Sequence, residues 1–350
     1  MLLAQSAKLI KTEVEMPSIA TSVHTKETTA PLAPPLTYGE ELRLRYPAEW
    51  PATLEAYEAW DAMDPNDRSF HLRECRSFAW FAVHKTSGQV KVVSSACHLR
   101  WCPLCAESRA LYLSFEVERW YRAAASPKLL TLTLRHSDIP LQDQIDQLYK
   151  AFRKLRQHSY MRKRIRGGIW FFQLKWIKKT ESWHPHIHAL IDSEFILHEQ
   201  IRQRWLKLTK GSDIVDIRLC WSSDAAANHV ARYATRPGTL SKVPYLERLE
   251  LLVVMDGRRI VGKWGNASHV HLVPPKELDH AMWTNAGSWR DIHNKSLTFK
   301  AAKAIILAWK MNICVNPDIV KQLFEQTVVT KPWLNDAQGN EYYSQSIFDP

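Results

Sequence analysis

The sequence predicts an α+β protein in which an antiparallel sheet carries helices on its faces, with a cysteine-rich hairpin before the sheet and a small helical region after it. Three patterns support this prediction. Apolar and polar residues alternate in several segments of strand length, residues 141–160 have helical periodicity, and four cysteines surround a predicted hairpin. Short links between successive strands favour antiparallel pairing.

Local periodicity assigns the elements. Residues 128–135 alternate Leu with Thr, as expected for a strand with one apolar face. Apolar residues recur every three or four positions over 141–160, which indicates an amphipathic helix. The other expected elements are strands at 169–177, 184–191 and 213–219, helices near 201–208, 223–235, 298–311 and after Pro317, and a hairpin over 251–261 around Asp256-Gly257.

Four regions are expected along the chain. Residues 1–38 mix Thr, Ser, Pro and charged residues without apolar periodicity, which is typical of a disordered arm. Residues 39–125 contain the cysteine-rich hairpin and flanking helices, and 126–265 form the central α+β core. Residues 266–350 form a helical accessory region with no evident chemistry.

The composition favours a polyanionic partner. The 350 residues include 47 Lys and Arg against 36 Asp and Glu, a net charge of +11. No segment resembles a membrane span, and the first residues lack the basic-then-apolar order of a secretory signal. A cytoplasmic location is therefore expected.

Three cysteines lie within nine residues, and the predicted hairpin over 76–96, turning near Thr86, would bring a fourth beside them. Such a set favours a tetrahedral structural zinc site in a zinc-ribbon-like hairpin over a disulfide framework. The expected ligands are Cys75, Cys97, Cys102 and Cys105. His98 or His71 would substitute if Cys75 does not reach the ion, and a redox Cys-x-x-Cys is the alternative interpretation. Cys220 and Cys314 are isolated and are expected to be buried.

The segment His184-Pro-His-Ile-His188 runs into an apolar strand. Because side chains alternate along a strand, His184, His186 and His188 share one face and can converge on one metal ion. A single histidine in a strand is usually structural, but three in alternation favour a metal site.

The predicted helix over 223–235 and its end contain a phenol, a base and a cation on one face: Tyr233, His229 and Arg236. A tyrosine becomes a covalent nucleophile when one group takes its proton and another stabilises charge on the electrophile. Taken alone, three such residues on one helix face serve packing more often than catalysis.

Residues 151–180 contain ten Lys or Arg and no acid, interleaved with aromatic residues. Basic side chains neutralise phosphates and aromatic rings stack on unpaired bases, so this segment is expected to bind DNA, with a solvated basic face as the alternative. The residues expected to contact DNA are Arg162, Lys163, Arg164, Arg166, Lys175 and Lys178.

Taken in order, these segments resemble the HUH endonucleases, specifically the single-tyrosine rolling-circle replication initiators of small bacterial plasmids. The resemblance covers about Cys75 to Trp264. The similar segments are residues 97–105 (cysteine-rich), 130–134 (first strand), 184–190 (metal motif), 229–237 (tyrosine motif) and 256–261.

The resemblance implies a fold, a site and a reaction. His186 and His188 match the two metal ligands of these enzymes, and Gln173 stands where the family has an acidic or Gln third ligand, with His184 as the alternative. A lone Gln among Trp and Phe residues also needs a partner. The ion would be Mg²⁺ or Mn²⁺. Tyr233 would attack a phosphate of single-stranded DNA, leaving a 5′-phosphotyrosyl bond and a 3′-hydroxyl that primes replication.

Implied partners are single-stranded or melted origin DNA, a host helicase and a DNA polymerase. Two departures concern the tyrosine helix. His229 replaces a Glu that activates water at termination, and Arg236 replaces a Lys; imidazole can act as a general base near pH 7, and Arg keeps the charge.

Three other readings compete with a plasmid initiator. HUH transposases share the cysteine-rich ribbon and His pair, although many use two tyrosines and only Tyr233 is present here. The chain could also be a non-catalytic zinc-containing DNA-binding protein, or a metal-dependent hydrolase that uses water. Replacing Tyr233 by Phe separates these readings.

Overall fold

The computed structural model describes residues 35–220, 240–273, 281–325, 334–335 and 341–342. Most of the expected N-terminal arm lies outside the described residues. So does the expected helix over 223–235, with His229, Tyr233 and Arg236.

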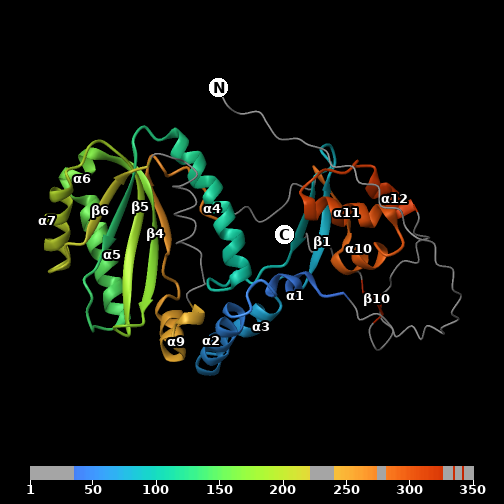
Figure 1. The fold of residues 1–350 in the computed structure, drawn as a ribbon, viewed down its shortest axis with the longest axis horizontal. Helices are drawn as coiled ribbons and strands as arrows, with labels where there is room; N and C mark the ends of the chain where they lie inside the picture. The colour runs from blue at the N-terminus through green and yellow to red at the C-terminus, as the bar shows by residue number, and fades with distance from the viewer. Residues whose placement is uncertain (1–34, 221–239, 274–280, 326–333, 336–340, 343–350) are drawn as a thin grey trace, which may run out of the picture. The chain divides into compact units, whose positions relative to one another are not determined.

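A five-stranded antiparallel sheet with helices packed against it contains the predicted histidine strand (Figure 1), which confirms the predicted α+β class. Its strand order is β6-β3-β5-β4-β7, so the histidine strand β5 is central. The strands are β3 (Pro127–Thr133), β4 (Ile165–Ile177), β5 (Ser182–Ser193), β6 (Val215–Leu219) and β7 (Val261–Gly265). The predicted antiparallel pairing of the second strand with the histidine strand is confirmed by twelve residue pairs from Ile165↔Ser193 to Ile177↔Ser182.

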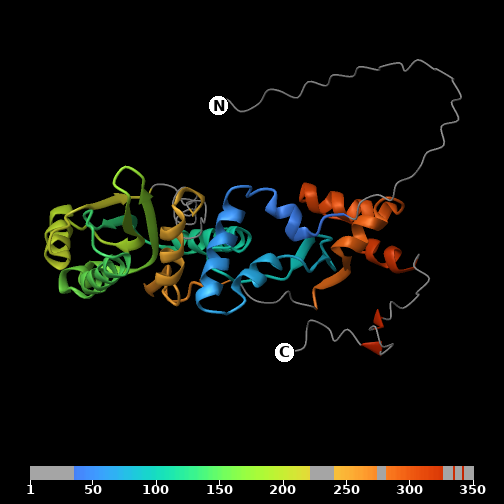
Figure 2. The same ribbon diagram turned by 90° about the horizontal axis from the view of Figure 1, so that it is seen from below.

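Helices cover both faces of this sheet (Figures 1 and 2). On one face, α5 (Leu141–Gln157) and α7 (His198–Thr209) bury apolar side chains against those of β3, β4 and β5. On the other face, Leu113, Val117 and Trp120 of α4 (Pro103–Ala123) pack against Phe171 and Leu190. The predicted helix over 141–160 ends earlier than expected, and α6 (Ser159–Arg164) follows it.

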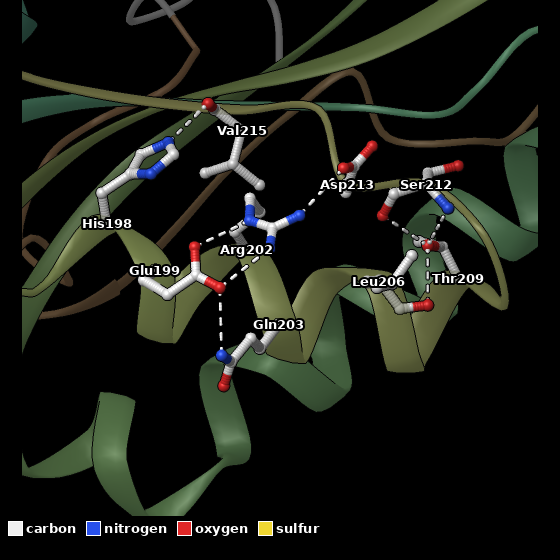
Figure 3. A network of polar contacts seen from close by, with 9 residues as sticks. All are labelled: His198, Glu199, Arg202, Gln203, Leu206, Thr209, Ser212, Asp213 and Val215. Carbon is white, nitrogen blue, oxygen red and sulfur yellow. Dashed lines mark hydrogen bonds and ion pairs between the residues drawn. The ribbon is translucent and has the colours of Figure 1, made fainter.

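The edge strand β6 is fixed to α7 by a polar network (Figure 3). Arg202 donates to both Glu199 and Asp213, at 2.8 and 3.0 Å. Thr209 Oγ1 accepts from the Ser212 N–H at 3.0 Å and donates to the Trp205 carbonyl at 2.7 Å. These contacts lock the turn between α7 and β6, and β6 is the last described element before residue 221.

The predicted hairpin is confirmed, with strands β1 (Ala79–His84) and β2 (Val90–Ser94). Sequence analysis missed a third strand, β8 (Trp283–Ser288), which pairs with β1 to give the order β2-β1-β8. Apolar residues of this sheet are buried with those of three helices: α10 (Trp289–Lys295), α11 (Lys300–Met311) and α12 (Ile319–Glu325). The hairpin and the C-terminal helices therefore share a core.

The expected hairpin over 251–261 is wrong. Helix α9 (Tyr245–Val254) occupies its first half, and only β7 follows as a strand. The run of Leu and Val before Asp256-Gly257 suggested a strand, but Leu251, Leu252 and Met255 are buried at helical spacing.

The remaining described elements lie near the chain ends or between larger ones. They are α1 (Tyr38–Arg43), α2 (Glu49–Met63), α3 (Arg68–Arg73), a 3₁₀ turn at Leu240–Lys242, β9 (Leu334–Asn335) and β10 (Glu341–Tyr342). Among the described helices, none combines the length and apolar character that crossing a bilayer requires.

Candidate functional site

Strand register places the predicted metal ligands on one face of the central sheet. Gln173 on β4 lies directly opposite His186 on β5, and His188 is two residues further along β5. Directly paired residues point to the same face of a sheet. Gln173, His186 and His188 thus project together, toward the face that also carries α4.

Two threonines of β3 orient the imidazoles. Thr133 pairs with His186 and Thr131 pairs with His188 across the strands. Hydrogen bonds join Thr133 Oγ1 to His186 Nδ1 at 2.8 Å and Thr131 Oγ1 to His188 Nδ1 at 3.1 Å. When Nδ1 of His186 carries the proton and donates it to the hydroxyl, the Nε2 lone pair of that ring is directed away from β3. His188 Nε2 faces Gln173 Oε1, which can only accept, so this nitrogen carries the proton that a bound cation would replace.

His186 has the chemistry of a metal ligand. Its Nε2 is buried and has no hydrogen-bond partner among the described residues. Burial, with help from nearby His184, His188 and Lys175, lowers the pKa of His186 to about 3. The ring is therefore neutral near pH 7, with its Nε2 lone pair available to a cation.

Gln173 adds an amide oxygen on the face that the two histidines share. Its Oε1 lies 2.9 Å from His188 Nε2. The Gln173 amide was expected to need a polar partner, and His188 supplies it. An imidazole pair with one amide oxygen is a donor set that suits a borderline divalent cation.

His184 is placed differently. Its Nε2 lies 3.2 Å from the Leu134 carbonyl oxygen, which can only accept, so this nitrogen carries the proton. The His184 and His186 ring centroids are 4.4 Å apart. His184 packs beside His186, and its Nε2 is not available to an ion.

The four predicted zinc ligands come together. Their sulfur atoms all lie within 4.8 Å of one another and can hold a metal ion. Three of the pairs are 3.5 to 3.6 Å apart: Cys75–Cys105, Cys97–Cys105 and Cys75–Cys102. Zinc–sulfur bonds of about 2.3 Å at tetrahedral angles place sulfurs about 3.8 Å apart, so the cluster fits a tetrahedral ion.

Local structure delivers these thiols as predicted. Cys75 and Cys97 lie at the open end of the β1–β2 hairpin, where the Arg76 N–H donates to the Ser95 carbonyl. Cys102 caps α4 and Cys105 lies in its first turn, where the helix dipole favours thiolates. Neither His71 nor His98 is needed as a substitute ligand.

The cysteine cluster is connected to the central sheet. Arg100, inside the cysteine-rich segment, donates hydrogen bonds to the carbonyl oxygens of Met255 and Arg258, in the link between α9 and β7. The two isolated cysteines differ from expectation: Cys220 is half-buried and Cys314 is exposed. Cys314 lies just beyond α11, in a single bridge to Gln89.

The basic residues predicted to bind DNA fall into two groups. Arg162, Lys163 and Arg164 end α6, whereas Lys175 lies toward the other end of β4, opposite His184, and Lys178 follows that strand. Nine residues of extended strand, about 30 Å, separate Arg166 from Lys175. Arg166 donates to the buried Asp192 at 2.9 Å.

Sequence reasoning missed Thr131 and Thr133 as site residues. The Leu–Thr alternation of their strand marked an apolar face, but it also placed two hydroxyls on the face that the histidines share. Nothing in the sequence of β3 alone showed its register against β5.

Comparisons with known proteins identify the family of this chain. The Rep_1 family model, described as a replication protein, matches residues 90–313, well over half of the chain. A protein named Protein rep from a Bacillus species is 27% identical over 165 residues, which cover 42% of this chain and 53% of that protein.

Two further relatives share that name. The protein from Bacillus amyloliquefaciens is 28% identical over 42% of this chain and 48% of its own length, and the one from Staphylococcus aureus is 26% identical over 39% and 65%. The chain thus spans about half to two thirds of these relatives. No solved structure is significantly similar to it. The match of the family model over residues 90–313 shows that the chain belongs to the Rep_1 family of replication proteins.

Proposed function

We propose that the protein is a plasmid rolling-circle replication initiator that nicks and rejoins single-stranded origin DNA, with residues 126–265 as its endonuclease core. The observation that carries this proposal is the convergence of His186, His188 and Gln173 on one face of the sheet, in a member of a replication protein family. Relatives named Protein rep support it.

The proposed catalytic ion is Mg²⁺ or Mn²⁺, held by His186 Nε2, His188 Nε2 and Gln173 Oε1. Such an ion withdraws charge from a phosphate oxygen and makes the phosphorus more electrophilic. The buried, unpartnered Nε2 of His186 supports this assignment, because most buried polar atoms have a partner and a cation would supply one here. Thr131 and Thr133 act as positioning residues for the imidazoles.

Tyr233 is the proposed nucleophile. Its phenolate oxygen forms a bond to phosphorus, and the bond from phosphorus to the 3′-oxygen breaks; the phenol loses one proton and the leaving 3′-oxygen gains one. The products are a 5′-phosphotyrosyl linkage and a free 3′-hydroxyl. We assign proton transfer to His229 and charge stabilisation to Arg236, on the basis of their shared helix face in the sequence.

The cysteine cluster is proposed to hold a structural zinc ion. The sulfur spacing supports zinc, and the hydrogen bonds of Arg100 connect the cluster to the link before β7, a strand of the sheet that carries the histidines. A helicase and a DNA polymerase of the host are the proposed protein partners, since a primed strand must be unwound and extended.

A cleavage assay tests the proposal. Labelled single-stranded DNA containing the origin region is incubated with Mn²⁺ and the products are resolved on a denaturing gel. We expect cleavage by the wild-type protein and no cleavage by His186→Ala or Tyr233→Phe. Cleavage that survives in Tyr233→Phe would indicate water as the nucleophile and would contradict the proposal, whereas DNA binding without cleavage in any metal would indicate a non-catalytic protein.

A further inference from the structure

The exposed face of α11 is basic and contains no acid. Lys300, Lys303 and Lys310 lie on the side of the helix opposite to Ala302, Ile305 and Ala308, which are buried in the core of the β2-β1-β8 sheet. Leu307 and Met311 lie between these lysines on the same face and are 51% and 61% exposed. No Asp or Glu occurs anywhere in α11.

This pattern differs from that of an ordinary solvated helix. Exposed helix faces usually mix charges of both signs, because Glu–Lys pairs one turn apart stabilise the helix. Within the described residues, Lys300, Lys303 and Lys310 form no ion pair, whereas Lys295 of α10 and Lys321 of α12 are each paired with an Asp. Among α10, α11 and α12, only α11 therefore carries lysines without an acidic partner in the described residues.

The surrounding structure shares this charge. Residues 79–94 and 281–325, which build the sheet and its helices, contain eight Lys or Arg and three Asp or Glu. Two of those three acids are the partners of Lys295 and Lys321. A polyanion is the complementary partner for such a surface.

The dimensions of α11 suit double-stranded DNA. Lys300 and Lys310 are separated by about 15 Å along the helix axis, and the major groove of B-DNA is about 12 Å wide and admits an α-helix. Lysines at both ends of the helix can thus reach phosphates on both edges of the groove. A four-residue link, 296–299, joins α10 to α11. Helix–turn–helix elements use links of this length, and their second helix enters the groove.

We propose that α11 is a second DNA-binding surface, which docks on double-stranded DNA through Lys300, Lys303 and Lys310. The inference rests on the proposed function only in taking DNA as the partner. It adds a duplex-binding element outside the metal site, where single strands are cleaved. Because the contacts are to phosphates, they hold the duplex without reading its sequence.

Binding of labelled 30-base-pair duplex DNA at several salt concentrations tests this inference. The variant Lys300→Gln/Lys303→Gln/Lys310→Gln removes three phosphate contacts, so the slope of log affinity against log salt should be smaller by about 2.7. Between 50 and 200 mM salt, the affinity of the wild type should fall about 40-fold more than that of the variant. Mn²⁺-dependent cleavage of a short single strand should not change, which separates this test from that of the proposed function.

A matched control removes three exposed lysines that lie away from α11: Lys150→Gln/Lys207→Gln/Lys210→Gln. Lys150 is on α5, Lys207 is on α7, and Lys210 directly follows α7. We expect this control variant to keep the duplex salt slope of the wild type. Three results would each overturn the inference. The control variant could lose as much of the duplex salt slope as the α11 variant, the α11 variant could keep the wild-type slope, or the α11 variant could lose as much affinity for single strands as for duplex. If the triple variant unfolds, the three single variants replace it, each with a slope smaller by about 0.9.

Discussion

Thr133 Oγ1 and His186 Nδ1 lie 2.8 Å apart across the β3–β5 strand pair, and the opposite nitrogen of the same ring is buried without a partner. The hydroxyl defines which way the imidazole faces, and Thr131 does the same for His188. A partner of this kind fixes the tautomer that coordinates a metal.

Replacing Thr133 by Val should therefore weaken Mn²⁺ binding 10- to 100-fold, the range for residues that orient metal ligands. Isothermal titration of the protein with MnCl₂ measures this effect. Thr133→Ser keeps the hydroxyl and serves as the matched control, with an affinity close to that of the wild type. Equal affinities for the Val and Ser variants would show that the hydrogen bond does not orient His186.

Gln173 and His184 are competing candidates for the third ligand, and single substitutions distinguish them. Gln173→Ala should lower Mn²⁺ affinity at least tenfold, and Gln173→Glu should raise it because a carboxylate adds negative charge. His184→Ala should have the smaller effect, since His184 Nε2 is bonded to the Leu134 carbonyl. A larger loss in His184→Ala than in Gln173→Ala would reverse the assignment.

The cysteine cluster predicts about one zinc ion per chain. Elemental analysis of purified Cys102→Ser should find that zinc is lost or strongly reduced, and the variant should melt at a lower temperature because the three remaining thiols then lack their cation. Cys314→Ser is the control, since Cys314 is exposed and outside the cluster. Full zinc content in Cys102→Ser would contradict the four-cysteine site.

Asp192 links stability to pH. The Arg166 guanidinium that donates to this carboxyl lowers its pKa from 3.8 to about 2. The folded state binds the proton less tightly than the unfolded state, so the interaction stabilises the fold above pH 3.8 and its contribution disappears as the pH falls through about 2.

Asp192→Asn should therefore lower the free energy of unfolding by roughly 2 kcal/mol at pH 7, as expected for hydrogen bonds to a charged group. Urea unfolding at pH 7 and at pH 3 measures the difference between wild type and variant, which should narrow at the lower pH. A difference that stays constant with pH would show that the charge of Asp192 is not involved.

The sequence was sufficient to predict elements whose pattern is local. The strand β3 and the helix α5 were assigned correctly because each buries one regular face. The strand β5 was assigned from its alternating histidines and the apolar run that follows them. Cys75 was placed beside Cys97 because the turn of a hairpin sets its register. His184, His186 and His188 could be placed on one face because side chains alternate along a strand.

Long-range pairing was not predictable in this way. Strand β8 pairs with β1 about two hundred residues earlier, and its sequence, Trp-Thr-Asn-Ala-Gly-Ser, has no strong strand signal. The hairpin predicted near Asp256 was wrong because Leu and Val runs suit buried helices as well as strands. The contacts of Thr131 and Thr133 depend on the register of β3 against β5, which no single strand encodes.

The central claim is that Tyr233 becomes covalently attached to DNA. The protein is incubated with single-stranded origin DNA and Mn²⁺, digested with nuclease and trypsin, and analysed by mass spectrometry. We predict a nucleotide-phosphate adduct on the peptide spanning residues 233–242, absent after EDTA treatment and in Tyr233→Phe. Cleaved DNA with no adduct on that peptide would contradict a tyrosine mechanism and identify water or another side chain as the nucleophile.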